Sequence, residues 1–453
     1  TGPAVPKPGN PNIVYTNCKG RFGVFDKRTG QELQYYVGAS NIYGHNPKDL
    51  KFRFQRVAPI HVSPHNPDVV YHTSQYVHKT TDDGKTWEII SPDLTAFEAD
   101  KQIVPGSPIT RDVTGEEYYS TIYAIRESPI QEGLIWVGAN DGPVHVTRDG
   151  GKTWKNVTPT MPPGGRVDAV EPSPHNPAKA YVAVLRYQLD DYAPYIYKTE
   201  DYGQTWTLIS DGKNGIPADY PTRVVREDPD KKGVLYAGTE FGLFISFDDG
   251  KKWHAFESNL PVTPITDIKV HQGDLVMSTM GRGFWILDNL ISLRNVPEIG
   301  SRKVVLFETR PAVRNQLSGR RETNGPEYPS SGAELDFFLA DKIQGLRLEI
   351  LDKNKKLVRA FEPNMKKDSV NTERNMSTEF SNPPASPTLP NQAGMNHFKW
   401  NMRHSGGWDK DPNRAYTGNG PLVATGTYIA RLKAGDEVIE QEFEVILDPR
   451  TTL

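Results

Sequence analysis

The chain contains 453 residues, with 53 Lys and Arg against 56 Asp and Glu, so its formal charge is only −3. That balance excludes binding to nucleic acid or to a membrane surface driven by net charge, and no run of eighteen apolar residues is present to span a membrane. The 39 glycines and 37 prolines are typical of a turn-rich β protein. The single cysteine, Cys18, excludes an internal disulfide framework and a cysteine-based zinc site.

The first residues of the chain predict no regular structure. Residues 1–12 (TGPAVPKPGNPN) are rich in proline and glycine, which favours a linker or a loop of a larger fold. The chain has neither an initiator methionine nor a signal peptide, so we expect a fragment or a processed chain.

An eight-residue motif recurs four times and organises the chain up to about residue 290. Its pattern is Ser/Thr-x-Asp-x-Gly-x-Thr/Lys-Trp, at residues 80–87, 147–154, 199–206 and 246–253. Weaker copies surround Asp26 and Asp288, and the six aspartates are 40 to 67 residues apart. This spacing predicts one four-stranded propeller blade per motif, hence about six blades over residues 13–290, incomplete at the ends.

The chemistry of the motif is structural. Asp followed by x-Gly makes a tight turn, because Asp bonds its own backbone and Gly supplies a positive φ. Apolar residues precede each turn and Trp follows it, so the turn joins two strands and the indole packs between blades. The predicted structural residues are Asp82, Gly84, Trp87, Asp149, Gly151, Trp154, Asp201, Gly203, Trp206, Asp248, Gly250 and Trp253.

A second signal precedes these motifs. Ser63-Pro64, Ser128-Pro129, Ser173-Pro174 and Asp228-Pro229 each stand shortly before a strand-like apolar stretch. We interpret them as the turns that separate the innermost strand of a blade from the second strand.

The motif is identified as the Asp-box, or BNR repeat, and the chain resembles the Asp-box propeller proteins, which include sialidases, tandem-propeller xyloglucan hydrolases and the sortilin luminal domain. It resembles more closely the bacterial secreted glycosyl hydrolase and sortilin (VPS10)-like BNR repeat proteins, through residues 90–95 (ISPDLT), 238–242 (GTEFG) and 281–288 (GRGFWILD). The resemblance implies a β-propeller that is the C-terminal part of a longer, bacterial protein. It also implies a secreted, periplasmic or outer-surface location. The arginine triad and Phe-Arg-Ile-Pro segment of sialidases are not found, so we do not expect that activity.

The last third changes character. Residues 291–302 are predicted to be a linker, and residues 303–450 alternate apolar and polar side chains with period two. We predict an immunoglobulin-like β-sandwich there, with a long exposed loop over residues 363–395.

Loops that join the second and third strands of each blade share one face of a propeller, here called the top face. Counting back from the motifs places Asp141, Glu240 and the longer loop 186–195 on it. As candidate catalytic carboxylates we take Asp141, Glu240, Asp190 and Asp191, and as candidate ligand-binding residues Tyr76, Arg186, Tyr187, Tyr192 and Arg282. Asp141 and Glu240 have the alternative role of holding their turns, and Arg282 that of bracing loops.

Metal and cofactor sites are not predicted. His61, His65, His72 and His78 lie close in sequence, but strand alternation is expected to scatter their directions and leave them solvated or capping. The Asp-Asp-Gly turns lack the ligand series of a calcium loop.

Three functions remain open at this point. The first is a secreted or cell-envelope recognition scaffold that binds a protein or glycan on the top face. The alternative is a glycoside hydrolase or other polysaccharide-degrading enzyme of the Asp-box type, and the third is a structural subunit of a larger envelope complex. Two carboxylates facing each other across a cleft, one with a raised pKa, would favour the enzyme. We expect a missing propeller segment or a partner chain to complete the ring, and neither nucleic-acid binding nor membrane insertion.

Overall fold

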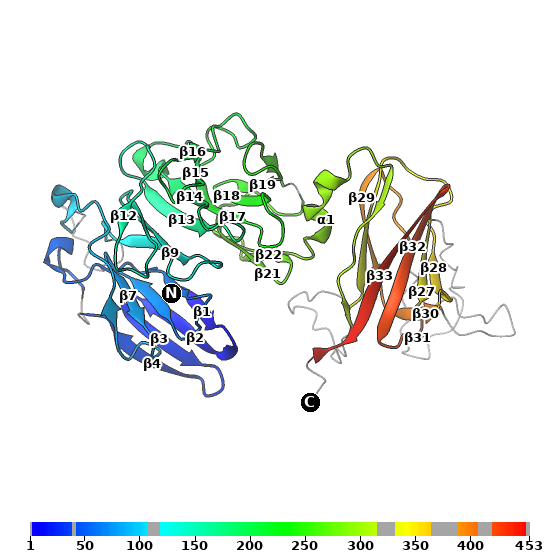
Figure 1. Cartoon of the computed structure of the whole chain (residues 1–453), viewed down its shortest axis with the longest axis horizontal. Helices are drawn as coiled ribbons and strands as arrows, with labels where there is room; N and C mark the ends of the chain where they lie inside the picture. The colour runs from blue at the N-terminus through cyan, green and yellow to red at the C-terminus, as the bar shows by residue number, and fades with distance from the viewer. Residues whose placement is uncertain are drawn as a thin grey trace, which may run out of the picture. The chain divides into compact units, whose positions relative to one another are not determined.

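The computed structural model describes residues 2–38, 42–104, 106, 118–256, 258–314, 331–363, 388–405 and 419–449, and it divides into two compact units, Thr1–Leu287 and Asp288–Leu453. Unit 1 is a β-propeller. Its described strands form six antiparallel sheets, and in each sheet the strands pair in the order of the chain. These sheets, called blades 1 to 6, succeed one another through unit 1 from the blue to the green end of the colour scale (Figure 1).

The bounds of the first three blades are as follows. Blade 1 contains β1 (Ala4–Lys7), β2 (Asn10–Cys18), β3 (Arg21–Asp26) and β4 (Gln31–Tyr36). Blade 2 contains β5 (Ile60–Val62), β6 (Val70–Thr73), β7 (Val77–Thr80) and β8 (Glu88–Ile89). Blade 3 contains β9 (Ile122–Glu127), β10 (Ile135–Ala139), β11 (Val144–Thr147) and β12 (Lys155–Asn156). The short helices η1 (Pro47–Asp49) and η2 (Ala99–Lys101) lie in the connections.

The other three blades repeat this arrangement. Blade 4 contains β13 (Arg166–Pro172), β14 (Ala180–Leu185), β15 (Tyr195–Thr199) and β16 (Thr207–Leu208), with η3 (Tyr187–Leu189) before β15. Blade 5 contains β17 (Thr222–Glu227), β18 (Leu235–Thr239), β19 (Gly242–Ser246) and β20 (His254–Ala255). Blade 6 has three described strands, β21 (Ile265–His271), β22 (Asp274–Thr279) and β23 (Phe284–Leu287).

Residues 1–12, expected as a linker or loop, instead supply β1 and the start of β2. Val5 pairs with Tyr15 across the two strands and packs against the apolar cluster between blades 1 and 2. β1 is an edge strand of its sheet, where a proline such as Pro6 is tolerated. The composition was misleading because strand pairing depends on a partner further along the chain.

The eight-residue motif forms the turn between the third and fourth strands of blades 2 to 5, and blade 3 shows its hydrogen bonds. The Asp149 carboxylate accepts hydrogen bonds from the backbone N–H and the hydroxyl of Thr153 and from the hydroxyl of Thr147. These bonds lower the pKa of Asp149 to about 2. Gly151 has φ +97°, and a Cβ there would lie 2.7 Å from the Ile90 carbonyl oxygen of blade 2. The glycine is therefore required by both the turn and the contact between blades.

Three of the motif tryptophans form hydrogen bonds between neighbouring blades. The indole N–H groups of Trp154, Trp206 and Trp253 donate to backbone carbonyls of the preceding blade, at 2.8, 2.6 and 2.7 Å. Trp87 instead bonds the Gly84 carbonyl of its own turn at 2.9 Å. Apolar clusters likewise lie between successive blades, so each blade is stabilised by its neighbours.

Unit 2 begins with α1 (Ile291–Arg294) and η4 (Val296–Glu298), which occupy the segment expected as a linker. One sheet has the order β24 (Val304–Leu306), β26 (Ala333–Leu339), β29 (Gly394–Trp400). A second has the order β25 (Ala312–Arg314), β33 (Glu437–Leu447), β32 (Gly426–Ala434), β27 (Arg347–Asp352), β28 (Leu357–Phe361). A further pair consists of β30 (Arg403–Ser405) and β31 (Asn419–Leu422).

Both larger sheets of unit 2 contribute to one hydrophobic core. Phe337 and Trp400 come from the three-stranded sheet, and Leu348 and Phe443 from the five-stranded one. Of the loop predicted over 363–395, residues 364–387 lie outside the described residues, whereas Leu389 is buried in the core and β29 already begins at Gly394. No helix in the described ranges is long and apolar enough to cross a membrane.

Candidate binding site on the top face

The top face of the propeller contains a pocket of about 560 Å³ that five blades share. Its lining extends from residues 55–57, which precede β5, to Met280, which follows β22. Asn140 and residues 187–189 come from the loops between the second and third strands of blades 3 and 4. The innermost strands supply Tyr123, Arg166 and Arg223.

Four charged side chains form a continuous network at this pocket. Arg166 binds Asp168 through two nitrogens, of which Nη2 donates to Oδ2 at 3.0 Å. Arg223 Nε donates to Glu240 Oε1 at 2.5 Å, and Arg223 Nη1 lies 3.9 Å from Asp168 Oδ2. Asp168 thus lies between two arginines, and Arg223 lies between two carboxylates. Adding Arg56, which also lines the pocket, leaves an excess of one positive charge.

Burial shapes the protonation of this network. It raises the pKa of the Asp168 carboxyl, and the hydrogen bonds and charges of Arg166 and Arg223 only partly oppose the effect. Burial also lowers the pKa of the Arg166 guanidinium, but the hydrogen bonds and charge of Asp168 outweigh it, so that this pKa is raised. Arg166 therefore remains cationic at the pocket.

Tyrosines flank the two guanidinium groups. Arg166 lies 4.7 Å from the ring centre of Tyr123, and Arg223 lies 5.7 Å from that of Tyr187. Arg166 Nη1 and Arg223 Nη2 donate no hydrogen bond to any described residue. The pocket therefore combines aromatic faces with N–H donors that remain available for a ligand.

The structure does not bring the four candidate catalytic carboxylates together. Only Glu240 joins the network. Asp141 is 3% exposed, and its Oδ2 accepts the backbone N–H groups of Ala96 and Phe97 at 3.0 and 3.3 Å. Burial raises the pKa of Asp141. These bonds hold the loop that follows blade 2, which favours the loop-holding role of Asp141 over the acid/base role.

Asp191 is also engaged within its loop. It accepts hydrogen bonds from Arg186 Nε at 2.7 Å and from the Tyr195 hydroxyl at 2.9 Å. Arg186 further donates to the carbonyl groups of residues 162, 163 and 164. The pair braces the loop 162–164 and the loop 186–195, and the ligand-binding role expected for Arg186 stays a prediction. Asp190 is exposed at the end of η3 with φ +58°.

The remaining candidates separate as well. Tyr187 lines the pocket, and Tyr192 is exposed. Tyr76 is half-buried, and its ring makes T-shaped contacts with the rings of Phe52 and His78. Arg282 is exposed and donates to the Gly281 carbonyl at 3.2 Å.

Sequence analysis missed Tyr123, Arg166, Asp168 and Arg223. All four lie on innermost strands, whereas the predicted site residues were taken from loops. The sequence signal that could have indicated them is a polar residue inside an otherwise apolar strand that follows a proline-containing loop.

The histidines of blade 2 are not scattered as expected. His72 and His78 pair across β6 and β7, which places both rings on one face, where both stack on Phe54. Burial lowers their pKa values to about 4 and about 3, so they are neutral core residues. His65 does cap a neighbour, since its Nε2 lies 2.8 Å from the Ser128 carbonyl oxygen. In the described ranges, no group of three His, Cys, Asp or Glu residues could hold a metal ion.

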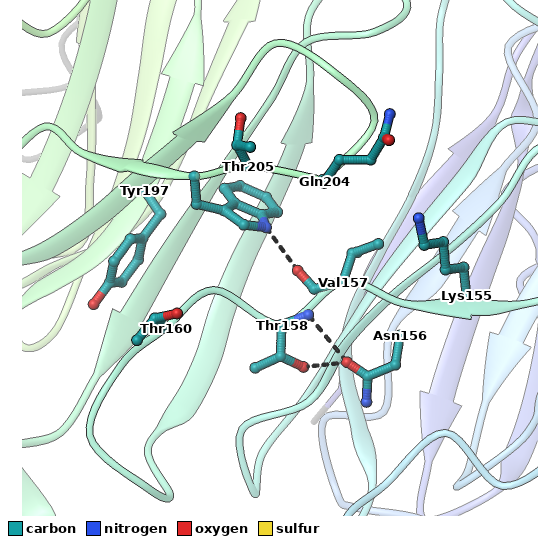
Figure 2. A pocket seen from close by; sticks show the side chains of 10 residues that line it. Lys155, Asn156, Val157, Thr158, Thr160, Tyr197, Gln204 and Thr205 are labelled. Carbon is teal, nitrogen blue, oxygen red and sulfur yellow. Dashed lines mark hydrogen bonds between the residues drawn. The ribbon is translucent and has the colours of Figure 1, made fainter.

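A second pocket lies at the junction of blades 3 and 4, beside the motif turn of blade 4 (Figure 2). The Trp206 indole donates to the Val157 carbonyl, and Asn156 accepts both the backbone N–H and the hydroxyl of Thr158. Since these polar groups satisfy one another, the pocket reflects the contact between two blades.

Comparison with known proteins gives fold-level likenesses only. No family model and no curated protein matches the chain. A GH74 xyloglucanase from Xanthomonas campestris is 18% identical, with a TM-score of 0.45 over 61% of this chain and 43% of that one. PorZ, a surface component of the type-IX secretion system of Porphyromonas gingivalis, is 14% identical, with a TM-score of 0.43 over 98% of this chain and 51% of that one. YCF48 from Cyanidioschyzon merolae is 13% identical, with a TM-score of 0.38 over 61% and 82%.

The chain therefore spans about half the length of the xyloglucanase and of PorZ. The class that the fold defines is that of the β-propeller proteins.

Proposed function

We propose that this chain is the recognition part of a bacterial secreted or cell-envelope protein of the Asp-box type, and that its top-face pocket binds a glycan. The observation that carries the proposal is the pairing of two guanidinium groups, each with an unused donor, with tyrosine rings around a pocket of about 560 Å³. Sugar rings stack on aromatic faces, and arginine donors suit hydroxyl and carboxylate oxygens. The small excess of positive charge favours a glycan that carries carboxylates.

A glycan array with the purified protein tests this proposal. Arg223→Gln removes the available donor and the link between Asp168 and Glu240, so binding of the best glycan is expected to weaken about tenfold or more. Asp190→Asn is the matched control, because Asp190 is exposed and outside the network. Equal binding by both variants would remove the pocket from consideration.

The glycoside hydrolase remains the second candidate because of one observation. Burial raises the pKa of Asp168, and Asp168 shares Arg223 with Glu240, so two carboxyl groups lie beside one pocket. A hydrolysis screen on polysaccharides, repeated with Glu240→Gln, decides between the two. Turnover that is lost in Glu240→Gln favours the enzyme, whereas intact binding without any turnover favours recognition.

We further propose that a propeller segment outside this chain, or a partner chain, covers blade 6. Phe284 and Ile286 are 82% and 59% exposed, and alternation places both on one face of β23. Unit 2 is proposed to be an immunoglobulin-like sandwich that serves as spacer or dock. Cross-linking in the bacterial host followed by mass spectrometry identifies what contacts β23, and cell fractionation tests the envelope location. An uncovered β23 in the intact protein would contradict the first proposal, and a cytosolic protein would contradict the second.

A further inference from the structure

One position of the innermost strand recurs in five blades and faces the central channel. In four blades it stands two residues before the Ser-Pro or Asp-Pro turn, as His61, Arg126, Glu171 and Arg226. In blade 6 the same position is Lys269 of β21. Lys269 precedes Val270, which pairs with Leu275, just as Arg226 precedes Glu227, which pairs with Leu235 in blade 5. All five side chains line a pocket of about 280 Å³, together with the prolines of the four turns. The pocket lies at the end of the channel opposite to the top face, because those turns join the first and second strands.

The two arginines at this pocket differ in their hydrogen-bond partners. Arg226 donates to Asp267 Oδ1 at 2.7 Å, to Glu171 Oε2 at 3.3 Å and to the Ile268 carbonyl at 2.9 Å. Arg126 forms no hydrogen bond or ion pair with any residue that the structure describes. The positive charge of Arg226, followed by burial, lowers the pKa of Arg126. Arg126 is thus a cation held beside another cation.

Two further donors lie at the same pocket. Burial lowers the pKa of Lys269, and the charge of Arg126 adds to the effect. Burial, with the charges of Arg126 and Lys269, lowers the pKa of His61 to about 3, so this ring is neutral. The His61 Nε2 atom is buried and has no partner among the described residues.

Glu171 and Asp267 attract Arg126 without a hydrogen bond to it, and this attraction is smaller than the repulsion from Arg226. Glu171 and Asp267 both engage Arg226. Glu127 and Glu227, at the next strand position, also line the pocket. Oε1 of each accepts a backbone N–H from a turn glycine, at 2.8 and 3.0 Å, and Oε2 of each is buried without a partner among the described residues. The repulsion from Arg226 is the largest effect on Arg126, and the charge of Arg126 acts in turn on Lys269 and His61, so positive charge prevails where these three side chains meet.

We propose that this end of the channel is a binding site for a small oxyanion, phosphate or sulfate, with Arg126 as its principal ligand. Lys269 and the neutral His61 supply further donors, while Arg226 stays with its two carboxylates. The ligand would relieve the repulsion between the two arginines and give the orphaned His61 nitrogen a partner. This site is separate from the top-face pocket and does not depend on its function.

Calorimetric titration with inorganic phosphate tests the proposal on the full chain. We expect one saturable site, weakened about tenfold or more in Arg126→Gln and unchanged in Lys152→Gln, an exposed lysine of the blade 3 motif. Without phosphate, Arg126→Gln should melt at the same or a higher temperature than the parent, because the repulsion from Arg226 that it removes exceeds the attraction to Glu171 and Asp267. With phosphate, only the parent and Lys152→Gln should gain thermal stability.

Three results would overturn the proposal. One is an absence of binding by the parent at millimolar phosphate. Another is a lower melting temperature of Arg126→Gln without phosphate, which would mean that Arg126 makes a native contact. The third is loss of phosphate binding in Arg223→Gln with retention in Arg126→Gln, which would place the anion in the top-face pocket.

Discussion

The residue after the motif aspartate of blade 5, Asp249, bonds two lysines of blade 4. Its Oδ1 accepts hydrogen bonds from Lys179 Nζ at 2.6 Å and from the Tyr181 hydroxyl at 2.5 Å, and its Oδ2 accepts one from Lys198 Nζ at 2.9 Å. The Lys179 side chain is only 3% exposed. Asp249→Asn removes the charge but tolerates the positive φ of 63°.

The expected cost follows from this burial. Removing one partner of a buried ion pair typically costs about 3–5 kcal/mol. Asp249 is 23% exposed and Lys179 keeps Glu227 at 3.9 Å, so we expect Asp249→Asn to lower the free energy of unfolding by about 2–3 kcal/mol. Urea unfolding followed by tryptophan fluorescence measures the change.

Blade 2 offers a matched control for this prediction. Asp83 has the same motif position and bonds Lys7 and Tyr15 of blade 1, but Asp83 is 41% exposed and Lys7 also binds Asp68 at 2.8 Å. Asp83→Asn should therefore cost less than about 1 kcal/mol. Equal costs for the two variants would refute the argument that burial of the lysine decides the strength of the contact between blades.

Three further predictions concern hydrogen bonds and pH. Trp253→Phe leaves a buried carbonyl without its donor and should cost about 1–3 kcal/mol in urea unfolding, whereas Trp285→Phe, whose N–H bonds an exposed carbonyl, should cost less than about 0.5 kcal/mol. The folded-state pKa of Asp149 is depressed to about 2, so its stabilisation is present above the unfolded value of about 4 and is lost as the pH falls through 2. Asp149→Asn should flatten the acid limb of a melting-temperature profile, and an unchanged limb would contradict this. The hydrogen bond to Asp336 raises the pKa of His397, so that pair stabilises unit 2 below the unfolded value of about 6.5 and ceases to do so as the pH rises through the folded value. His397→Gln should abolish this slope between neutral and mildly alkaline pH, and a slope that persists would mean that another group causes it.

The turns of the eight-residue motif could be predicted from sequence because their hydrogen bonds are local. Thr147, Asp149 and Thr153 satisfy one another within seven residues, so the motif alone specifies the turn and its place between two strands. The recurrence of such turns then predicts a propeller, since each blade is too small to bury its faces alone. Residues 1–12 show the limit of this reasoning, because Val5 belongs to a strand only through its pairing with Tyr15.

The candidate site was predicted only in part. Loop counting found Glu240 on the top face, but its partner Arg223 lies on an innermost strand, and Asp168 meets Arg223 only across two blades. Asp141 occupies a loop equivalent to that of Glu240, yet it binds the backbone of a neighbouring loop. Equivalent positions in the repeat therefore have different roles.

Sequence by itself determined the repeated turns, the succession of blades and the change of character after residue 290, because local hydrogen bonds and side-chain alternation encode them. Only the tertiary structure decided which polar side chains face the channel, which arginines form ion pairs and which carboxylates bond the backbone of loops. Those outcomes depend on how neighbouring blades approach one another. The contacts that set that approach join residues tens of positions apart in the chain.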